Sequence, residues 1–166
     1  MLTALAAAAE EIDLVDPFFD LRAVNGDYLG PLAELLARLA AMPVPSKTIR
    51  VHFRTHDTRP PSDILSRDSA ALTRGIIPDG YTLELCEWQE IPSGEDLHDR
   101  FFLTDIGGLM VGAGFSATGN AETAAFSLLD YSHVQQLRRR FVDGAAVYTK
   151  IGSTVRINSD GSTELI

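Results

Sequence analysis

The sequence predicts an α/β fold built on a mixed β-sheet, and two observations support this class. Between residues 12 and 91, short strand-like segments alternate with longer helix-like segments, an order typical of parallel strands joined by helical crossovers. After residue 97, closely spaced strand-like segments flank Gly107 and Gly108, which indicates a local antiparallel hairpin. We therefore expect a mixed sheet flanked by helices on both faces.

Length and composition limit the domain count and the class of partner. The chain has 166 residues, 45% of them hydrophobic, and a formal net charge of −9. This length suits one core, so we treat residues 1–166 as a single domain. The acidic charge disfavours broad, nonspecific binding of nucleic acid, whose phosphate backbone it repels. Cys86 is the only cysteine, which excludes a disulfide within the chain and favours a cytoplasmic location.

The first half of the chain contains three predicted strands. An Ala-rich start predicts a short helix, and acidic residues interrupt it too early for a transmembrane segment. A buried strand follows at 12–19, with Asp16 at its carboxyl end. Ile49, Val51 and Phe53 alternate with polar residues and predict a strand within 46–57 that has one wetter face. Similar alternation over 81–91 predicts the third strand.

Two helices connect these strands. Leucines at positions 32, 35, 36 and 39 predict a helix within 27–42, with Pro31 in its first turn. The second helix lies within 60–80, where Ser62 or Asp63 serves as the N-cap and Gly75 marks the end.

The second half of the chain is predicted to be rich in antiparallel strands. Residues 98–105 and 109–115 form the two arms of the hairpin, and 124–130 is a further strand. A helix over 132–141 follows, with Ser132 as its cap. This cap explains Ser132 better than a hydrolase triad with Asp130 and His133, because the three residues lie in one local segment. Residues 146–166 close the sheet as a hairpin with turns at Gly152 and at 159–161.

The pair His98 and Arg100 is the strongest candidate for chemistry. Alternate residues of a strand share a face, so both side chains are expected on the same side. An imidazole acts as a nucleophile or a general acid, and a guanidinium holds phosphoryl oxygens with paired donors. Gly112 and Gly114, on the far arm, would allow close approach of the backbone or a ligand.

The segment His98-x-Arg100-x4-Asp105-x6-Gly112 resembles the motif of the phospholipase D superfamily, His-x-Lys-x4-Asp-x6-Gly-Ser, with Arg in place of Lys. The predicted order of elements is also similar to a half-unit of that superfamily, and the resemblance covers roughly residues 10–145. It implies a phospholipase D-like fold, with His98 as nucleophile or general acid and Arg100 as the phosphate-binding residue. Asp105 lies an odd number of residues from His98, so we expect it to face away and to bind turn amides or support its neighbours.

Departures from the motif leave two functions open. Ala113 replaces the family serine, and Phe115 replaces an asparagine that often follows. The Arg form, "HDR", also resembles a divergent branch that includes the C-terminal domain of MIT-domain proteins, a lipid-binding or protein-binding module without established hydrolysis. In addition, this chemistry uses two His-containing motifs, and the chain has one. The resemblance therefore implies a homodimer, a second chain that supplies the other motif, or no catalysis.

The first hypothesis is a metal-independent phosphodiesterase, for example a nuclease, that works as a homodimer through a phosphohistidine and needs no cofactor. The alternative is an inactive domain that binds a phosphorylated ligand or serves as an interaction module in a larger assembly. A purely structural explanation also stays open, in which His98 packs at a sheet end and Arg100 pairs with Asp96 or Asp99.

Two further residues are candidates for the pocket. His52 and Arg54 would line it if their strand lies beside the hairpin. His52 and His56 share a strand face but lack a third ligand, so we expect a polar strand face there and no metal site.

Overall fold

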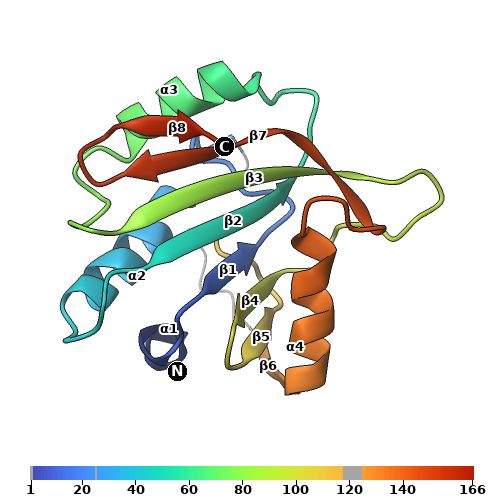
Figure 1. Cartoon of the computed structure of the whole chain (residues 1–166), viewed down its shortest axis with the longest axis horizontal. Coiled ribbons are helices and arrows are strands. Elements are labelled where there is room, and N and C mark those ends of the chain that lie inside the picture. Colours follow the sequence, from blue (N-terminus) through green and yellow to red (C-terminus); the bar gives the residue numbers. More distant parts are fainter. Residues whose placement is uncertain (1, 25, 118–124) are drawn as a thin grey trace.

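A computed structural model describes residues 2–24, 26–117 and 125–166 (Figure 1). Within these ranges the chain forms four α-helices and one eight-stranded sheet. The helices are α1 (Leu2–Ala8), α2 (Leu29–Ala40), α3 (Ser62–Leu72) and α4 (Tyr131–Arg138), and a 3₁₀ turn, η1 (Arg139–Phe141), follows α4. The strands are β1 (Ile12–Val15), β2 (Thr48–Arg54), β3 (Thr82–Glu90), β4 (Phe101–Thr104), β5 (Gly108–Val111), β6 (Phe126–Leu129), β7 (Tyr148–Asn158) and β8 (Thr163–Leu165).

The sheet is mixed, as predicted. Its strand order is β6-β5-β4-β1-β2-β3-β7-β8, in which β1, β2 and β3 are parallel and the other pairs are antiparallel. The predicted hairpin is β4–β5, and it pairs with β1 through β4. Because β4 runs against β1, its amino end lies beside the carboxyl ends of β1, β2 and β3. We call this side of the sheet the carboxyl edge.

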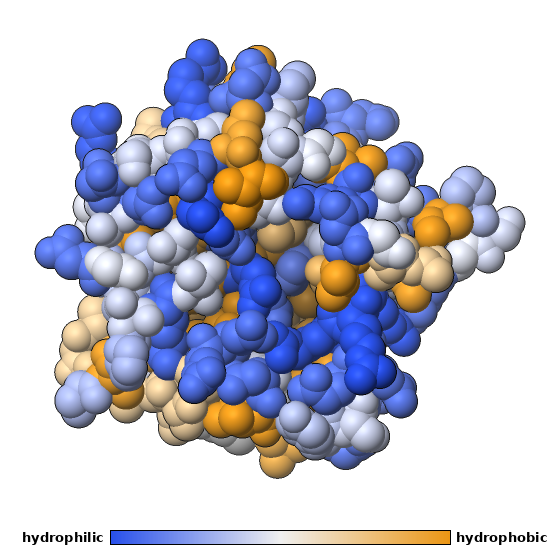
Figure 2. Space-filling model, in the orientation of Figure 1, coloured by the Kyte–Doolittle hydropathy of each residue, from blue (hydrophilic) through white to orange (hydrophobic). Residues whose placement is uncertain are grey.

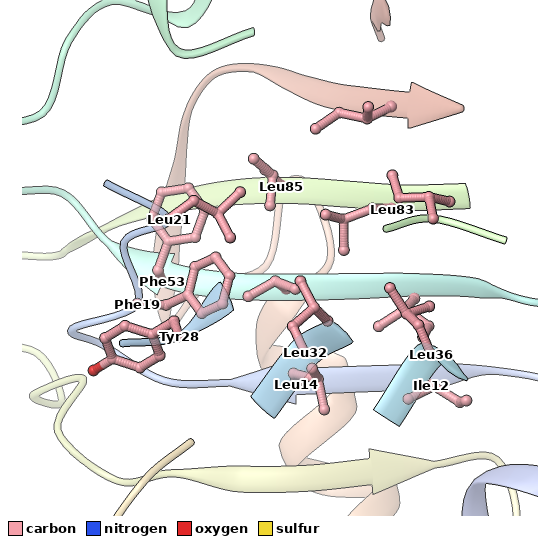
Figure 3. Close-up of a cluster of buried hydrophobic side chains, with 14 of the residues drawn as sticks. Ile12, Leu14, Phe19, Leu21, Tyr28, Leu32, Leu36, Phe53, Leu83 and Leu85 are labelled. Carbon is pink, nitrogen blue, oxygen red and sulfur yellow. The ribbon is translucent and has the colours of Figure 1, made fainter. Parts of the chain in front are cut away.

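Helices pack against both faces of the sheet (Figure 1). On one face, α1, α2 and α3 bury leucines and aromatic rings against alternate residues of the central strands, and Figure 3 shows part of this cluster. On the other face, Val134 and Leu137 of α4 pack against Trp88 and Leu103. Gly108 permits this approach, because a Cβ there would lie 2.9 Å from Val134 Cγ2.

Two details of α3 and β7 correct the predictions. α3 begins at Ser62 itself, after Pro61, and no side chain caps it, so the predicted cap at Ser62 or Asp63 is wrong. Proline suits the position before a helix because its ring fixes φ and it has no N–H to satisfy. Gly152 lies inside β7 with φ of 61°, next to a shift in the β3–β7 register, and not in a turn. It therefore accommodates a bulge in a long strand.

The start of α4 also differs from the prediction. Asp130 is the N-cap, and its Oδ1 accepts hydrogen bonds from His133 N at 2.9 Å and from Ser132 Oγ at 2.6 Å. Ser132 is therefore the second residue of the helix and not its cap. A carboxylate satisfies the free N–H groups of the first turn at least as well as a hydroxyl, so nothing at this position requires a hydrolase triad.

The surface carries mostly polar residues around this framework. On the face drawn in Figure 2, hydrophobic residues form small patches among hydrophilic ones. In the part of the chain that the structure describes, every helix is too short or too polar to cross a bilayer.

Candidate functional site

His98 and Arg100 lie at the carboxyl edge, immediately before β4. The prediction that they belong to the paired strand is wrong, because β4 begins at Phe101. The backbone is nevertheless anchored at this point, since Arg100 O accepts a hydrogen bond from Val111 N at 2.8 Å. The carboxyl end of this segment is therefore hydrogen-bonded to the sheet, while its amino-terminal part does not pair with a neighbouring strand.

Arg100 turns toward the end of β1. Its Nε lies 3.7 Å from Asp16 Oδ1, and its Cζ lies over the Phe18 ring, 5.1 Å from the centroid. Neither contact engages the two terminal Nη atoms, and the side chain is 28% exposed. Among residues 2–24, 26–117 and 125–166, no hydrogen-bond acceptor binds the two Nη atoms of Arg100.

Asp16 organises this part of the edge. It is fully buried, and it accepts hydrogen bonds from Phe18 N at 3.0 Å and from Phe115 N at 3.1 Å. Burial raises the pKa of Asp16 above its ordinary value, although these N–H groups and Arg100 oppose the change. One carboxyl group therefore joins the segment after β1, the segment after β5 and the Arg100 side chain.

Arg54, the last residue of β2, completes the site. Its Cζ also lies over the Phe18 ring, 5.4 Å from the centroid, and its Nη1 is 3.3 Å from Glu90 Oε1. Two guanidinium groups from different segments thus share one aromatic ring that is 37% exposed. We call Asp16, Phe18, Arg54 and Arg100 the anion site.

Sequence reasoning assigned no contact role to Phe18 or Asp16. The available signal was the segment Asp16-Pro17-Phe18, which follows a buried strand and places an acid and an aromatic side chain at a strand end. Arg54 was identified as a candidate pocket residue, and the structure brings it together with Arg100.

His98 is separate from these contacts. Its side chain is 65% exposed, and its Nδ1 lies 2.6 Å from Asp99 Oδ1. The alternative in which Arg100 pairs with Asp96 or Asp99 differs from the structure, where Asp99 pairs with His98 and Arg100 approaches Asp16. The carboxylate orients the imidazole and leaves its Nε2 atom free of this contact.

Gly112 and Gly114 contribute through their own backbone, whereas Asp105 binds backbone N–H groups with its side chain. Gly114 has φ of 78°, and a Cβ there would lie 2.8 Å from both Arg100 Cδ and Asp16 Oδ2. Its bare backbone is therefore required beside the anion site. Gly112 N donates to Ala125 O at 2.9 Å. Asp105 lies at the opposite end of β4, where its Oδ1 accepts hydrogen bonds from the backbone N–H groups of residues 10 and 11.

His52 lies away from the anion site, on the face covered by α4. It is 3% exposed, its Nε2 is 3.2 Å from Asp13 Oδ1, and Trp88 Nε1 donates to its Nδ1 at 3.0 Å. Since an indole N–H can only donate, Nδ1 of the neutral ring is the acceptor and Nε2 then carries the hydrogen. Burial alone would lower the pKa of His52, but the hydrogen bonds and charges of Asp13 and Cys86 outweigh it and raise the pKa to about 9. The face of β2 that was predicted to be more exposed to solvent is therefore buried at His52, where its polar side chains form a network.

Asp13 is the centre of that network. Its carboxylate lies 2.9 Å from Arg138 Nε and 3.0 Å from Arg50 Nε, in addition to the contact with His52. Burial alone would raise the pKa of Asp13, but the hydrogen bond and charge of His52 and the two arginines outweigh it and lower the pKa to about 2. This network holds β1, β2 and α4 together, and it adjoins the anion site through the backbone, where His52 O accepts a hydrogen bond from Asp16 N at 3.0 Å.

Comparison with known proteins found no family model and no curated protein that matches the chain. Within residues 2–24, 26–117 and 125–166, no three His, Cys, Asp or Glu side chains are grouped to hold a metal ion. The geometry of the carboxyl edge is therefore the feature of this chain that points to a function.

Proposed function

We propose that this chain binds a phosphorylated ligand at the anion site. The observation that carries the proposal is the convergence of Arg54 and Arg100 on one exposed aromatic ring, with about a third of each guanidinium side chain exposed. Arginine is suited to this task because its planar group offers paired donors that match phosphoryl oxygens.

The position of the site in the sheet supports the same function. β1 has a parallel neighbour, β2, on one side and an antiparallel neighbour, β4, on the other. Ligands of open α/β sheets commonly bind outside the carboxyl ends of the strands. At this edge the segment after β1 supplies Phe18, and the last residue of β2 is Arg54.

The local charge favours an anion despite the net charge of −9. Arg100 has only the buried Asp16 as a charged partner among these contacts, and burial raises the pKa of that carboxyl group. Arg54 shares its charge with Glu90 at 3.3 Å. Because Asp16 is fully buried while the Arg100 side chain is 28% exposed, the positive group of this pair is the one that faces solvent and can attract a phosphate.

Replacing Arg100 with glutamine is expected to lower the affinity for inorganic phosphate at least tenfold. Charge-assisted hydrogen bonds contribute about 1.5–3 kcal/mol each, and glutamine offers neither the charge nor the paired donors. Titration of the folded protein with phosphate, followed by isothermal calorimetry and by amide NMR shifts, measures the change.

The matched control is Arg67→Gln, because the Arg67 side chain is 75% exposed on α3 and pairs only with Asp68 among these ion pairs. It should bind phosphate as the wild type does. Equal losses in the two variants would indicate a general effect of surface charge and would contradict a site at Arg100.

A phosphodiesterase is the second candidate, and the His98–Asp99 pair is the observation that favours it. In a homodimer, His98 Nε2 of one protomer would attack phosphorus while the bond to the leaving oxygen breaks. The partner protomer's imidazolium would give its proton to that oxygen. The resulting imidazole would then take a proton from water, which would attack the phosphohistidine and release a phosphate monoester. The Asp99 carboxylate would stabilise the protonated ring.

This candidate predicts hydrolysis of bis-p-nitrophenyl phosphate without added metal and twice the monomer mass in sedimentation. His98→Ala should abolish turnover, whereas His133→Ala, which changes an exposed histidine of α4, should not. A monomer without turnover, or turnover that survives His98→Ala, rules the enzyme out and leaves the binding function.

A further inference from the structure

A polar groove adjoins the anion site where β2 and β3 end. It has a volume of about 290 Å³ and is lined by Arg54, Thr55, His56, Asp57, Gln89 and Glu90. Arg54 belongs to both the groove and the anion site, because it also lies over the Phe18 ring. A ligand whose phosphate is held at Arg100 and Arg54 can therefore extend into the groove without a break.

The groove offers both hydrogen-bond donors and acceptors. Arg54 donates to Glu90, and Gln89 has an exposed amide that both donates and accepts. Thr58 N donates to His56 Nδ1 at 3.3 Å, so in the neutral ring the other nitrogen, Nε2, carries a hydrogen. Asp57 adds a second carboxylate to that of Glu90.

This lining suits three kinds of ligand group less well than a hydroxyl group. An apolar group would remove the carboxylates from water without replacing their hydrogen bonds. A second phosphate would face Asp57 and Glu90. An ammonium group would be attracted by Asp57 but would compete with Arg54 for Glu90. A hydroxyl group satisfies every member of the lining, because it donates to the carboxylates and accepts from Arg54 and His56.

We propose that the groove binds the hydroxyl-bearing part of a small organic phosphate, and thus that the ligand is a sugar or polyol phosphate. This inference rests on the proposed function, because it places the phosphate of the ligand at the anion site. A volume of about 290 Å³ lies at the small end of ligand sites and suits one sugar unit.

The test compares three probes on the intact chain by calorimetry: inorganic phosphate, glucose 6-phosphate and phosphoethanolamine. Glucose 6-phosphate should bind at least tenfold more tightly than inorganic phosphate, and phosphoethanolamine should gain less than twofold. Gln89→Ala should remove most of the advantage of glucose 6-phosphate over phosphate. The matched control is Gln136→Ala, an exposed glutamine of α4, which should retain the full advantage.

The possible outcomes distinguish failure of the sugar-phosphate proposal from failure of phosphate binding at the anion site. If the wild type binds neither phosphate nor glucose 6-phosphate, both fail. If it binds the two equally, the groove assignment is overturned while the anion site stands. Tighter binding of phosphoethanolamine than of glucose 6-phosphate would overturn the hydroxyl assignment, and an equal loss in Gln89→Ala and Gln136→Ala would exclude the groove as the location.

Discussion

Asp13→Ala is expected to lower the free energy of unfolding by about 3 kcal/mol, because removing one partner of a buried ion pair leaves the others uncompensated. The Asp13 side chain is 7% exposed and contacts His52, Arg50 and Arg138. Without its carboxylate, the Nε2–H of His52 and the Nε of Arg138 lose their acceptor, and the His52 side chain is only 3% exposed. Urea unfolding, followed by the fluorescence of Trp88, measures the loss.

Glu11→Ala is the matched control for this prediction. Glu11 pairs with the same two arginines as Asp13, but its side chain is 50% exposed, so its loss should cost less than about 1 kcal/mol. Similar costs for the two variants would show that burial of Asp13 does not determine the strength of the network.

The acid dependence of stability provides a second signature of Asp13. Its pKa in the folded protein, about 2, is below the ordinary value of 3.8, so its contribution is fully present above about pH 4 and is lost as the pH falls toward 2. This difference corresponds to about 2 kcal/mol. The stability difference between wild type and Asp13→Asn should therefore shrink between pH 4 and pH 2, and a constant difference would contradict the assigned ionisation.

Gly114→Ala should cost about 3 kcal/mol of stability and lower the affinity for phosphate at least tenfold. The left-handed backbone at φ of 78° costs an alanine roughly 1–2 kcal/mol. The new Cβ would also lie 2.8 Å from Arg100 Cδ and Asp16 Oδ2, and crowding of this kind adds about 1–3 kcal/mol. Asp16 is fixed by Phe115 N, so the expected response is displacement of the Arg100 side chain.

Gly144→Ala separates the two contributions. Gly144 has a similar φ of 80°, but nothing lies within 4 Å of the position of its Cβ. It should therefore show the backbone cost alone and bind phosphate normally. The proposal fails if Gly114→Ala keeps the phosphate affinity of the wild type while its folded state is intact by NMR.

The buried network shows why sequence alone misassigned His52. Alternation of residues 49–54 correctly predicted a strand whose two faces differ in polarity. It could not predict that Phe141 of η1 would cover the polar face, with its ring centroid 4.8 Å from that of His52. Phe141 lies about 90 residues from His52 in the chain, so the local alternation of residues cannot predict that it packs there.

Asp105 of the candidate motif also shows which contacts local sequence can predict and which it cannot. Asp105 was expected to bind turn amides or to support its neighbours, but its Oδ1 accepts hydrogen bonds from the backbone N–H groups of residues 10 and 11, outside the hairpin turn. Thr104 occupies the turn, where its Oγ1 accepts from Gly107 N at 3.0 Å. The odd spacing between Asp105 and His98 predicted that the two side chains face different ways. The partner of Asp105 depended on which strand lies beside β4.

The mixed sheet could be predicted from the sequence, because the alternation of apolar residues along a strand and their helical spacing are local and set which face of each element is buried. The contacts of Arg100 with Asp16 and Phe18, and of Arg54 with the same ring, depend on tertiary packing. These residues come from three separate segments, and they converge because β1 is inserted between β4 and β2. The order of the strands depends on how the faces of the sheet and the helices pack together, and no single segment contains that information. This order places two arginines that are distant in the sequence at one candidate anion site.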